Sequence, residues 1–174
     1  MPINNYKLME NYFPINADWD QALNLLYKNA KGSQPRTEVL WFKITNRRIF
    51  DDLPNLRGFL EKINKDFDSD FFEQCKYYDD WATGRCRCKA IWHMDGPIIS
   101  LDDETVSAHK DINDAAYLQI LGKSFWKMDG KETVVINPGD LLFISKKITH
   151  EVWGEGPRMG VLLMAPNGTG EPRW

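Results

Sequence analysis

The sequence of 174 residues lacks the features expected of a nucleic-acid-binding or membrane protein. Its 22 Lys and Arg residues are outnumbered by 25 Asp and Glu residues, so no basic excess is available for phosphate contacts and we expect no nucleic-acid partner. No run of about 18 apolar residues is present, so we expect no transmembrane helix. The start, MPINNYKLMENYF, has no basic segment followed by an apolar stretch, so we expect no signal peptide and a cytoplasmic location.

Cysteine is also scarce, and its positions do not form a metal-binding group. Cys86 and Cys88 are two positions apart, Cys75 stands alone, and the count of three is odd. A structural zinc site would need four grouped soft ligands, which this sequence lacks. We therefore expect reduced thiols.

Aromatic residues are abundant, with 9 Phe, 7 Trp and 6 Tyr, which excludes disorder and favours a large apolar core. The length fits a single domain, residues 1–174. Within it we expect a helical N-terminal support over residues 1–70 and a β-barrel core over residues 71–166.

The first 70 residues carry two helical patterns. Residues 18–30 place apolar side chains on one face and end before Gly32, and a second helix is expected to begin near Pro54. The stretch between them, TEVLWFKIT at residues 37–45, is typical of a buried strand.

Beyond residue 70 the pattern predicts many short strands. We expect them at residues 71–79, 86–94, 105–109, 115–121, 125–128, 133–136, 141–144, 150–153 and 159–164. Turn signals separate them, among them residues 95–97 (Asp-Gly-Pro) and a hairpin signal at residues 129–130 (Asp-Gly). Such spacing favours a mainly β fold, a barrel or sandwich, with the N-terminal helices packed outside it.

Two of the three histidines occur where they could hold a metal ion. His109 and Asp111 are two apart on a predicted strand and so face the same way. A Pro-Gly-Asp turn at residues 138–140 leads into an apolar strand that would place His150 at the barrel mouth. Two imidazoles and one carboxylate form the facial triad that suits non-haem Fe(II). His93 with Asp95, or all three histidines together, remain alternative ligand sets.

The segments AHKDINDAAYLQILGKSFWKM and INPGDLLFISKKITH resemble the double-stranded β-helix oxygenases of the cupin/JmjC type. The matching positions, which span about residues 88–165, are His109, Asp111, Gln119, Gly122, Trp126, Pro138, Gly139, Asp140, Ile144 and His150. The resemblance implies a double-stranded β-helix and an Fe(II)- and 2-oxoglutarate-dependent dioxygenase that binds its metal through His109, Asp111 and His150. It also implies O₂ and a small molecule, amino acid or peptide side chain as substrates, most often with hydroxylation as the outcome.

The co-substrate anchor departs from this family pattern. Ser124 stands where JmjC-type members carry Lys or Arg, and Lys123 beside it would face the other way on a regular strand. Related oxygenases carry an Arg just past the distal His, and Arg158 follows His150 by eight positions. We favour Arg158 over Lys123 as the residue that binds the far carboxylate of 2-oxoglutarate, with a hydrogen bond from Ser124.

Tyr117 and Ser107 could share the face of His109 and touch the co-substrate, or simply fill the barrel. Two other functions remain open. One is a cupin metalloenzyme that does not use 2-oxoglutarate, and the other is a non-catalytic binding barrel.

Overall fold

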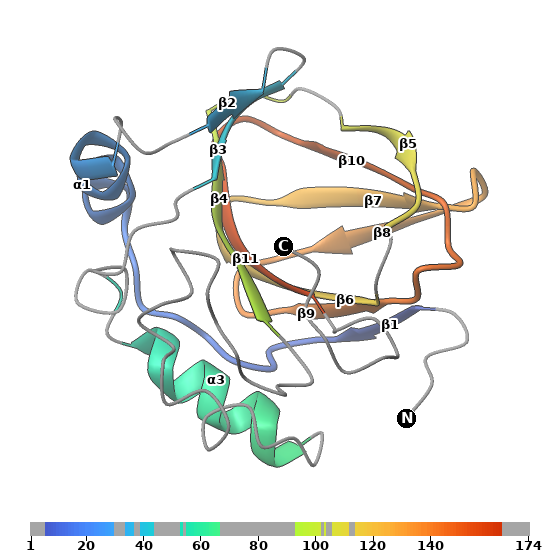
Figure 1. The fold of residues 1–174 in the computed structure, drawn as a ribbon, viewed down its shortest axis with the longest axis horizontal. Coiled ribbons are helices and arrows are strands. Elements are labelled where there is room, and N and C mark those ends of the chain that lie inside the picture. The colour runs from blue at the N-terminus through green and yellow to red at the C-terminus, as the bar shows by residue number, and fades with distance from the viewer. Residues whose placement is uncertain are drawn as a thin grey trace.

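The computed structural model describes residues 6–29, 34–36, 39–43, 53, 55–66, 93–101, 103, 106–111 and 114–164. The strands in these ranges form two antiparallel sheets that face each other (Figure 1). The major sheet has the strand order β1-β9-β6-β11-β4-β3-β2, and the minor sheet has the order β5-β10-β7-β8.

The strands of the major sheet are β1 (Tyr6–Met9), β2 (Gln34–Arg36), β3 (Val39–Lys43), β4 (His93–Ser100), β6 (Ala115–Leu121), β9 (Leu141–Ile144) and β11 (Arg158–Met164). Those of the minor sheet are β5 (Val106–His109), β7 (Ser124–Met128), β8 (Glu132–Ile136) and β10 (His150–Gly154). From β4 onward the chain alternates between the two sheets, except for the β7–β8 hairpin. Asp129 and Gly130 both have positive φ in that hairpin, as its sequence signal predicts.

Successive side chains on the strands of the major sheet point to opposite faces, so the core is divided into two layers. On β6, Ala116, Leu118 and Ile120 face the helices, whereas Tyr117 faces the minor sheet. On β11, the buried Val161 faces the helices in the same way. The major sheet lies between the two layers. It therefore packs against the helices on one face and lines the barrel interior on the other.

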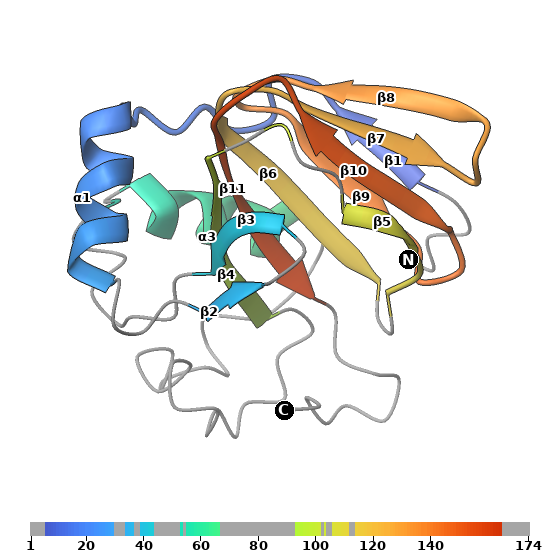
Figure 2. The same cartoon turned by 90° about the horizontal axis from the view of Figure 1, so that it is seen from above.

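Two helices cover the outer face of the major sheet, as predicted: α1 (Trp19–Asn29) and α3 (Asn55–Asp66) (Figure 2). A reciprocal pair of hydrogen bonds caps α1, because the backbone N–H of Gln21 donates to the Asp18 carboxylate (2.8 Å) and the backbone N–H of Asp18 donates to the Gln21 side chain (3.0 Å). Neither helix is long and apolar enough to cross a membrane.

The turn at residues 138–140 anchors the N-terminal segment. The buried Asp140 carboxylate accepts hydrogen bonds from the backbone N–H groups of Asn11 (2.8 Å) and Asn137 (2.9 Å). The backbone N–H of Phe13 donates to the carbonyl of Gly139, whose φ is +94°. This turn therefore ties the chain that follows β1 to the start of β9.

The turn predicted at residues 95–97 is wrong, because these residues lie inside β4. Pro97 pairs with Val161 of β11 next to an irregularity in register, while β3 pairs only with residues 98–100. The missing N–H of Pro97 therefore costs no hydrogen bond to β3, and the irregularity accommodates Gly96. The predicted strands at 71–79 and 86–92, the three cysteines and the side chain of His93 lie outside the described residues.

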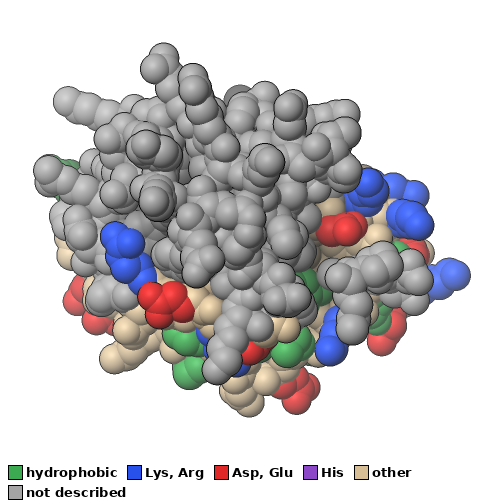
Figure 3. All heavy atoms as spheres, turned by 60° about the horizontal axis from the view of Figure 1, so that its bottom comes forward, with side chains coloured by type: hydrophobic (Ala, Val, Ile, Leu, Met, Phe, Trp, Pro, Cys, Tyr) green, Lys and Arg blue, Asp and Glu red, His purple; other side chains and the backbone are tan. Residues whose placement is uncertain are grey.

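Acidic and basic side chains lie close together on one face of the molecule. On the face in Figure 3, the described Lys and Arg side chains lie among Asp and Glu side chains. This distribution agrees with the small net charge of −3.

Phe59 tests the helical layer, because it is 0% exposed and its ring contacts the rings of Tyr12 and Phe13. We expect Phe59→Ala to lower the free energy of unfolding by about 3–5 kcal/mol, measured by urea denaturation. The control is Leu23→Ala on α1, because the Leu23 side chain is 50% exposed. This substitution should change the free energy of unfolding by less than about 0.5 kcal/mol. Equal effects of the two substitutions would contradict this packing.

Candidate metal centre and adjoining cavity

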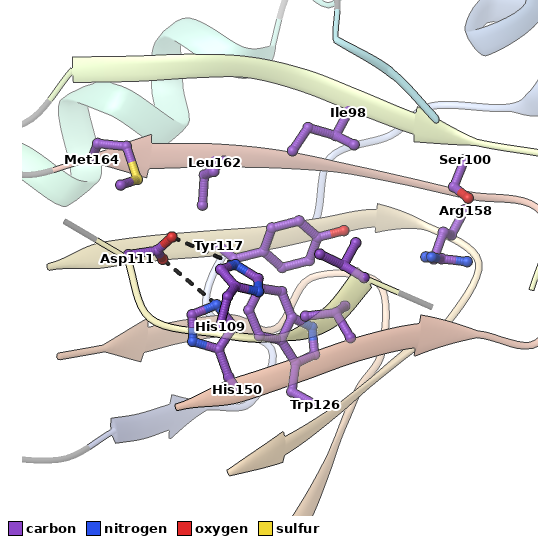
Figure 4. Close-up of a pocket in the computed structure, with 12 residues that line it drawn as sticks. Ile98, Ser100, His109, Asp111, Tyr117, Trp126, His150, Arg158, Leu162 and Met164 are labelled. Carbon is purple, nitrogen blue, oxygen red and sulfur yellow. Dashed lines mark ion pairs between the residues drawn. The ribbon is translucent and has the colours of Figure 1, made fainter. Parts of the chain in front are cut away.

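Adjacent strands of the minor sheet bring the two histidines together. His109 ends β5, His150 begins β10, and the two are paired in the register of these strands. Their ring centroids are 4.4 Å apart. Asp111 lies two positions past His109 and points at both rings (Figure 4).

The triad offers three ligand atoms around one point. The Asp111 carboxylate oxygens lie 3.7 Å from Nε2 of His109 and 3.6 Å from Nε2 of His150. One ligand atom from each residue lies within 4.8 Å of the others. A divalent ion with bonds of about 2.0–2.2 Å fits this donor set after small side-chain shifts.

Backbone carbonyls orient both imidazoles for this purpose. Nδ1 of His109 lies 2.8 Å from the carbonyl oxygen of Ser107, and Nδ1 of His150 lies 3.3 Å from that of Ile148. Donation from Nδ1 leaves Nε2 as the lone-pair nitrogen that faces Asp111. Burial lowers the pKa of His150, although the Asp111 carboxylate opposes the shift. The neutral imidazole is the form that binds metals.

A cavity of about 170 Å³ extends from the triad into the barrel. Its walls are mostly apolar and come from both sheets: Ile98, Val106, Tyr117, Trp126, Val152, Leu162 and Met164. The triad lies at one end, and Arg158 and Ser100 lie at the other, with Tyr117 and Trp126 between them (Figure 4). Of the described residues that line the cavity, Arg158 is the only Lys or Arg.

A glycine makes room for the Arg158 guanidinium. Arg158 is the first residue of β11, pairs with Ser100 of β4, and is only 6% exposed. A Cβ on Gly154 would lie 2.3 Å from Nη1 of Arg158, so the guanidinium passes over this glycine of β10. Gly154 pairs with Ser124 of β7, which brings Ser124 to the same end of the barrel.

A second glycine makes room for the Tyr117 side chain. A Cβ on Gly160 would lie 2.1 Å from the Tyr117 hydroxyl oxygen, so the phenol lies against bare backbone of β11. Burial raises the pKa of Tyr117 to about 12, against the opposing charge of Arg158 and a hydrogen bond with Ser124. The hydroxyl therefore stays protonated near neutral pH and can donate a hydrogen bond at the Arg158 end of the cavity.

A buried polar chain fixes Trp126 beside the triad. The Gln119 amide donates to the carbonyls of Leu121 (2.6 Å) and Met159 (3.3 Å). The Ser124 hydroxyl donates to Gln119 (2.7 Å) and accepts from the Trp126 indole N–H (3.1 Å). The Trp126 ring in turn lies 5.4 Å from the His150 ring and 5.0 Å from the Tyr117 ring, measured between centroids.

The structure thus brings His109, Asp111, His150, Tyr117 and Arg158 to one cavity. Ser124 lies behind the cavity, with its hydroxyl engaged by neighbouring side chains.

Two other predicted co-substrate residues lie elsewhere. Lys123 does not line the cavity, and its Nζ is 3.8 Å from the exposed Glu155 carboxylate. The Ser107 side chain is exposed, and Ser107 contributes only its carbonyl to the site.

Sequence reasoning missed the two glycines. Gly160 lies inside the strand RMGVLLM and Gly154 ends the strand HEVWG, and a glycine in a strand is the usual signal of a close approach by another group. Trp126 matches the family pattern in the sequence, but its contact with His150 depends on a cross-strand register that single strands do not reveal.

Metal binding should depend on the two imidazoles. We expect His109→Ala and His150→Ala to abolish stoichiometric Fe(II) binding in anaerobic calorimetry, since each removes one of three ligands. Ser107→Ala keeps the carbonyl that orients His109 and should bind Fe(II) as the unmodified protein does. Unchanged Fe(II) binding in both histidine variants would show that the ion is held elsewhere.

The contact between Gly160 and Tyr117 can be tested by a double-mutant cycle. Gly160→Ala should lower the free energy of unfolding by about 1–3 kcal/mol, because its methyl group meets the phenol ring. In a Tyr117→Ala background the same substitution should cost much less. An equal loss in both backgrounds would mean that the two residues do not share this space.

Comparison with known proteins was made by sequence and by structure. No family model and no curated protein matches the sequence. The fold is similar to that of a prolyl hydroxylase from Trichoplax adhaerens, solved with a peptide fragment of the hypoxia inducible factor oxygen degradation domain. That match has a TM-score of 0.59 and 9% identity, and it covers 96% of this chain and 86% of that one.

Shorter matches cover 44% of the chain. They include a cupin superfamily protein from Desulfitobacterium hafniense (TM-score 0.38, 17% identity, 68% of that chain). A ribosomal oxygenase from Escherichia coli, solved with cobalt and succinic acid, is another (TM-score 0.37, 26% identity, 25% of that chain). The architecture and the match over nearly the whole chain confirm the predicted fold, a mainly β double-stranded β-helix with its helices packed outside.

Proposed function

We propose that this protein is an Fe(II)- and 2-oxoglutarate-dependent dioxygenase that hydroxylates a small molecule, an amino acid or a peptide side chain. The observation that carries the proposal is a single cavity with a two-histidine, one-carboxylate group at one end and a buried arginine at the other. Its partners are then the substrate and O₂.

The donor set favours iron among the divalent metals. His109, Asp111 and His150 would occupy one face of the ion and leave the opposite positions open. Bound there, Fe(II) would supply the redox centre at which O₂ reacts. Nδ1 of each imidazole faces a carbonyl oxygen, which leaves Nε2 as the nitrogen that would bind the ion.

The far end of the cavity suits the second carboxylate of 2-oxoglutarate. The planar guanidinium of Arg158 can bind a carboxylate through two parallel hydrogen bonds. The protonated Tyr117 hydroxyl would add a third donor, since its pKa is held at about 12. A buried carboxylate without such partners would be strongly disfavoured, so both residues support a dicarboxylate rather than a neutral ligand.

The apolar walls exclude water along the length of this ligand. Ile98 of β4 and Leu162 and Met164 of β11 face Tyr117 and the triad across the cavity (Figure 4). A dry cavity strengthens the charge interactions at both ends and protects reactive species from solvent.

Arg158 provides the sharpest test of co-substrate use. We expect Arg158→Ala to weaken 2-oxoglutarate binding by roughly a few hundredfold, since removal of one partner from a buried ion pair costs about 3–5 kcal/mol. Calorimetry in the presence of Mn(II) would measure both the co-substrate and the metal affinity, and the latter should stay within about twofold. Lys123→Ala is the matched control, because Lys123 pairs with Glu155 and does not line the cavity, and it should bind 2-oxoglutarate normally.

Three results would change the proposal. Normal binding by Arg158→Ala with loss in Lys123→Ala would move the anchor to Lys123. Absence of 2-oxoglutarate binding by the unmodified, metal-loaded protein would favour a cupin metalloenzyme of another kind. Failure to release succinate from 2-oxoglutarate with Fe(II) and O₂, despite binding, would favour a binding barrel.

A further inference from the structure

The outer face of the minor sheet carries a row of apolar side chains. Trp153 of β10, Phe125 of β7 and Val135 of β8 lie side by side in the register of the three strands. The Trp153 and Phe125 rings stack with centroids 5.6 Å apart and planes at 11°, both are half-buried, and Val135 is 38% exposed. In Figure 2 these strands lie uppermost, and no described helix or strand covers them.

Charged residues flank this row with opposite signs on the two central strands. On β10 and just beyond it, Glu151 and Glu155 lie two positions before and after Trp153. On β7 and just before it, Lys127 and Lys123 lie two positions after and before Phe125. Glu151 pairs with Lys127 in the register, and Lys123 lies 3.8 Å from Glu155. The face therefore has an acid–aromatic–acid column beside a base–aromatic–base column.

We propose that this face binds a second copy of the same chain around a twofold axis that runs parallel to β10 and β7 and between them. Rotation about such an axis lays β10 of each copy over β7 of the other and keeps every row in register. Glu151 then faces Lys127 of the other copy, and Glu155 faces its Lys123. In the middle row, Trp153 of each copy meets Phe125 of the other.

The acidic column on β10 and the basic column on β7 favour a second copy of this chain over other partners. A twofold interface buries the same patch on both sides, so the patch must complement its own image, as these two columns do. An anionic polymer would meet two Glu side chains, and an uncharged apolar surface would have to desolvate four charged side chains with nothing of opposite charge on its own side. Two sheets that pack face to face keep their strands within about 30° of each other, which this arrangement satisfies.

The expected dimer is reversible and sensitive to salt. The apolar row is short, and the flanking charges are partly exposed, so each ion pair contributes little and is screened by ions. Dissociation should therefore increase with ionic strength. The inference uses only the outer face and is independent of the metal, the co-substrate and the proposed activity.

A charge swap tests the proposal directly. Lys127→Glu leaves two acidic side chains in the row formed by positions 127 of β7 and 151 of β10. Glu151→Lys leaves two basic side chains in the same row. Each variant alone should be mainly monomeric, because like charges then face each other across the interface. An equimolar mixture of the two should form a heterodimer, because every pair in that row is again opposite in charge. Sedimentation velocity at low salt, from micromolar to millimolar protein, measures all three samples.

Matched controls carry the same change of charge away from this face. Lys7→Glu lies on β1 of the major sheet and Glu10→Lys lies just after that strand, and both positions are exposed. Both controls should dimerise as the unmodified protein does. Trp153→Gln changes no charge and should weaken the dimer by about tenfold or more, because aromatic residues at the centre of an interface dominate its affinity.

The proposal is overturned by a monomeric unmodified protein over the whole concentration range. It is also overturned by dimers that both swap variants retain, or by a mixture of folded variants that stays monomeric. Thermal unfolding near that of the unmodified protein establishes that the variants are folded. If either is not, Trp153→Gln decides: retained affinity contradicts the interface, and tenfold weakening supports it.

Discussion

The alternation of side chains along β6 and β11 is the constraint on which both the core and the candidate site depend. Leu118 and Val161 face the helices, and Tyr117 and Arg158 face the cavity from the same two strands. A shift of one residue in either strand would exchange these sets, burying Arg158 against α1 and α3 and moving core residues into the cavity. The packing of the helices therefore fixes the orientation of the groups that would bind a co-substrate.

The site is supported from behind by small residues and a polar chain. Gly154 and Gly160 leave space for the Arg158 and Tyr117 side chains, and the Gln119–Ser124–Trp126 hydrogen bonds hold an indole against His150. These contacts couple the two ends of the cavity. The Gln119–Ser124–Trp126 hydrogen bonds join β6 of the major sheet to β7 of the minor sheet. The positions of the side chains that would bind metal and co-substrate therefore depend on the spacing of the two sheets.

Within the described residues, the sequence predicts most strands, both helices and the grouped triad, because these follow from local periodicity and from residues two positions apart. Residues 95–97 mislead, since an Asp-Gly-Pro segment that usually turns can continue as a strand where an irregularity in register accommodates it. The roles of Gly154 and Gly160 could not be predicted, because they depend on which side chain of another strand crosses them. The outward position of Lys123, by contrast, follows from strand alternation, because its neighbour Ser124 is buried.

A crystal structure of the protein grown with Mn(II) and 2-oxoglutarate under anaerobic conditions tests the central claim most directly. The account predicts one metal ion bound by His109, Asp111 and His150, with the keto-acid end of 2-oxoglutarate on that ion and its far carboxylate on Arg158 and Tyr117. Electron density for the ion at other residues, or for 2-oxoglutarate with its far carboxylate away from Arg158, would contradict it.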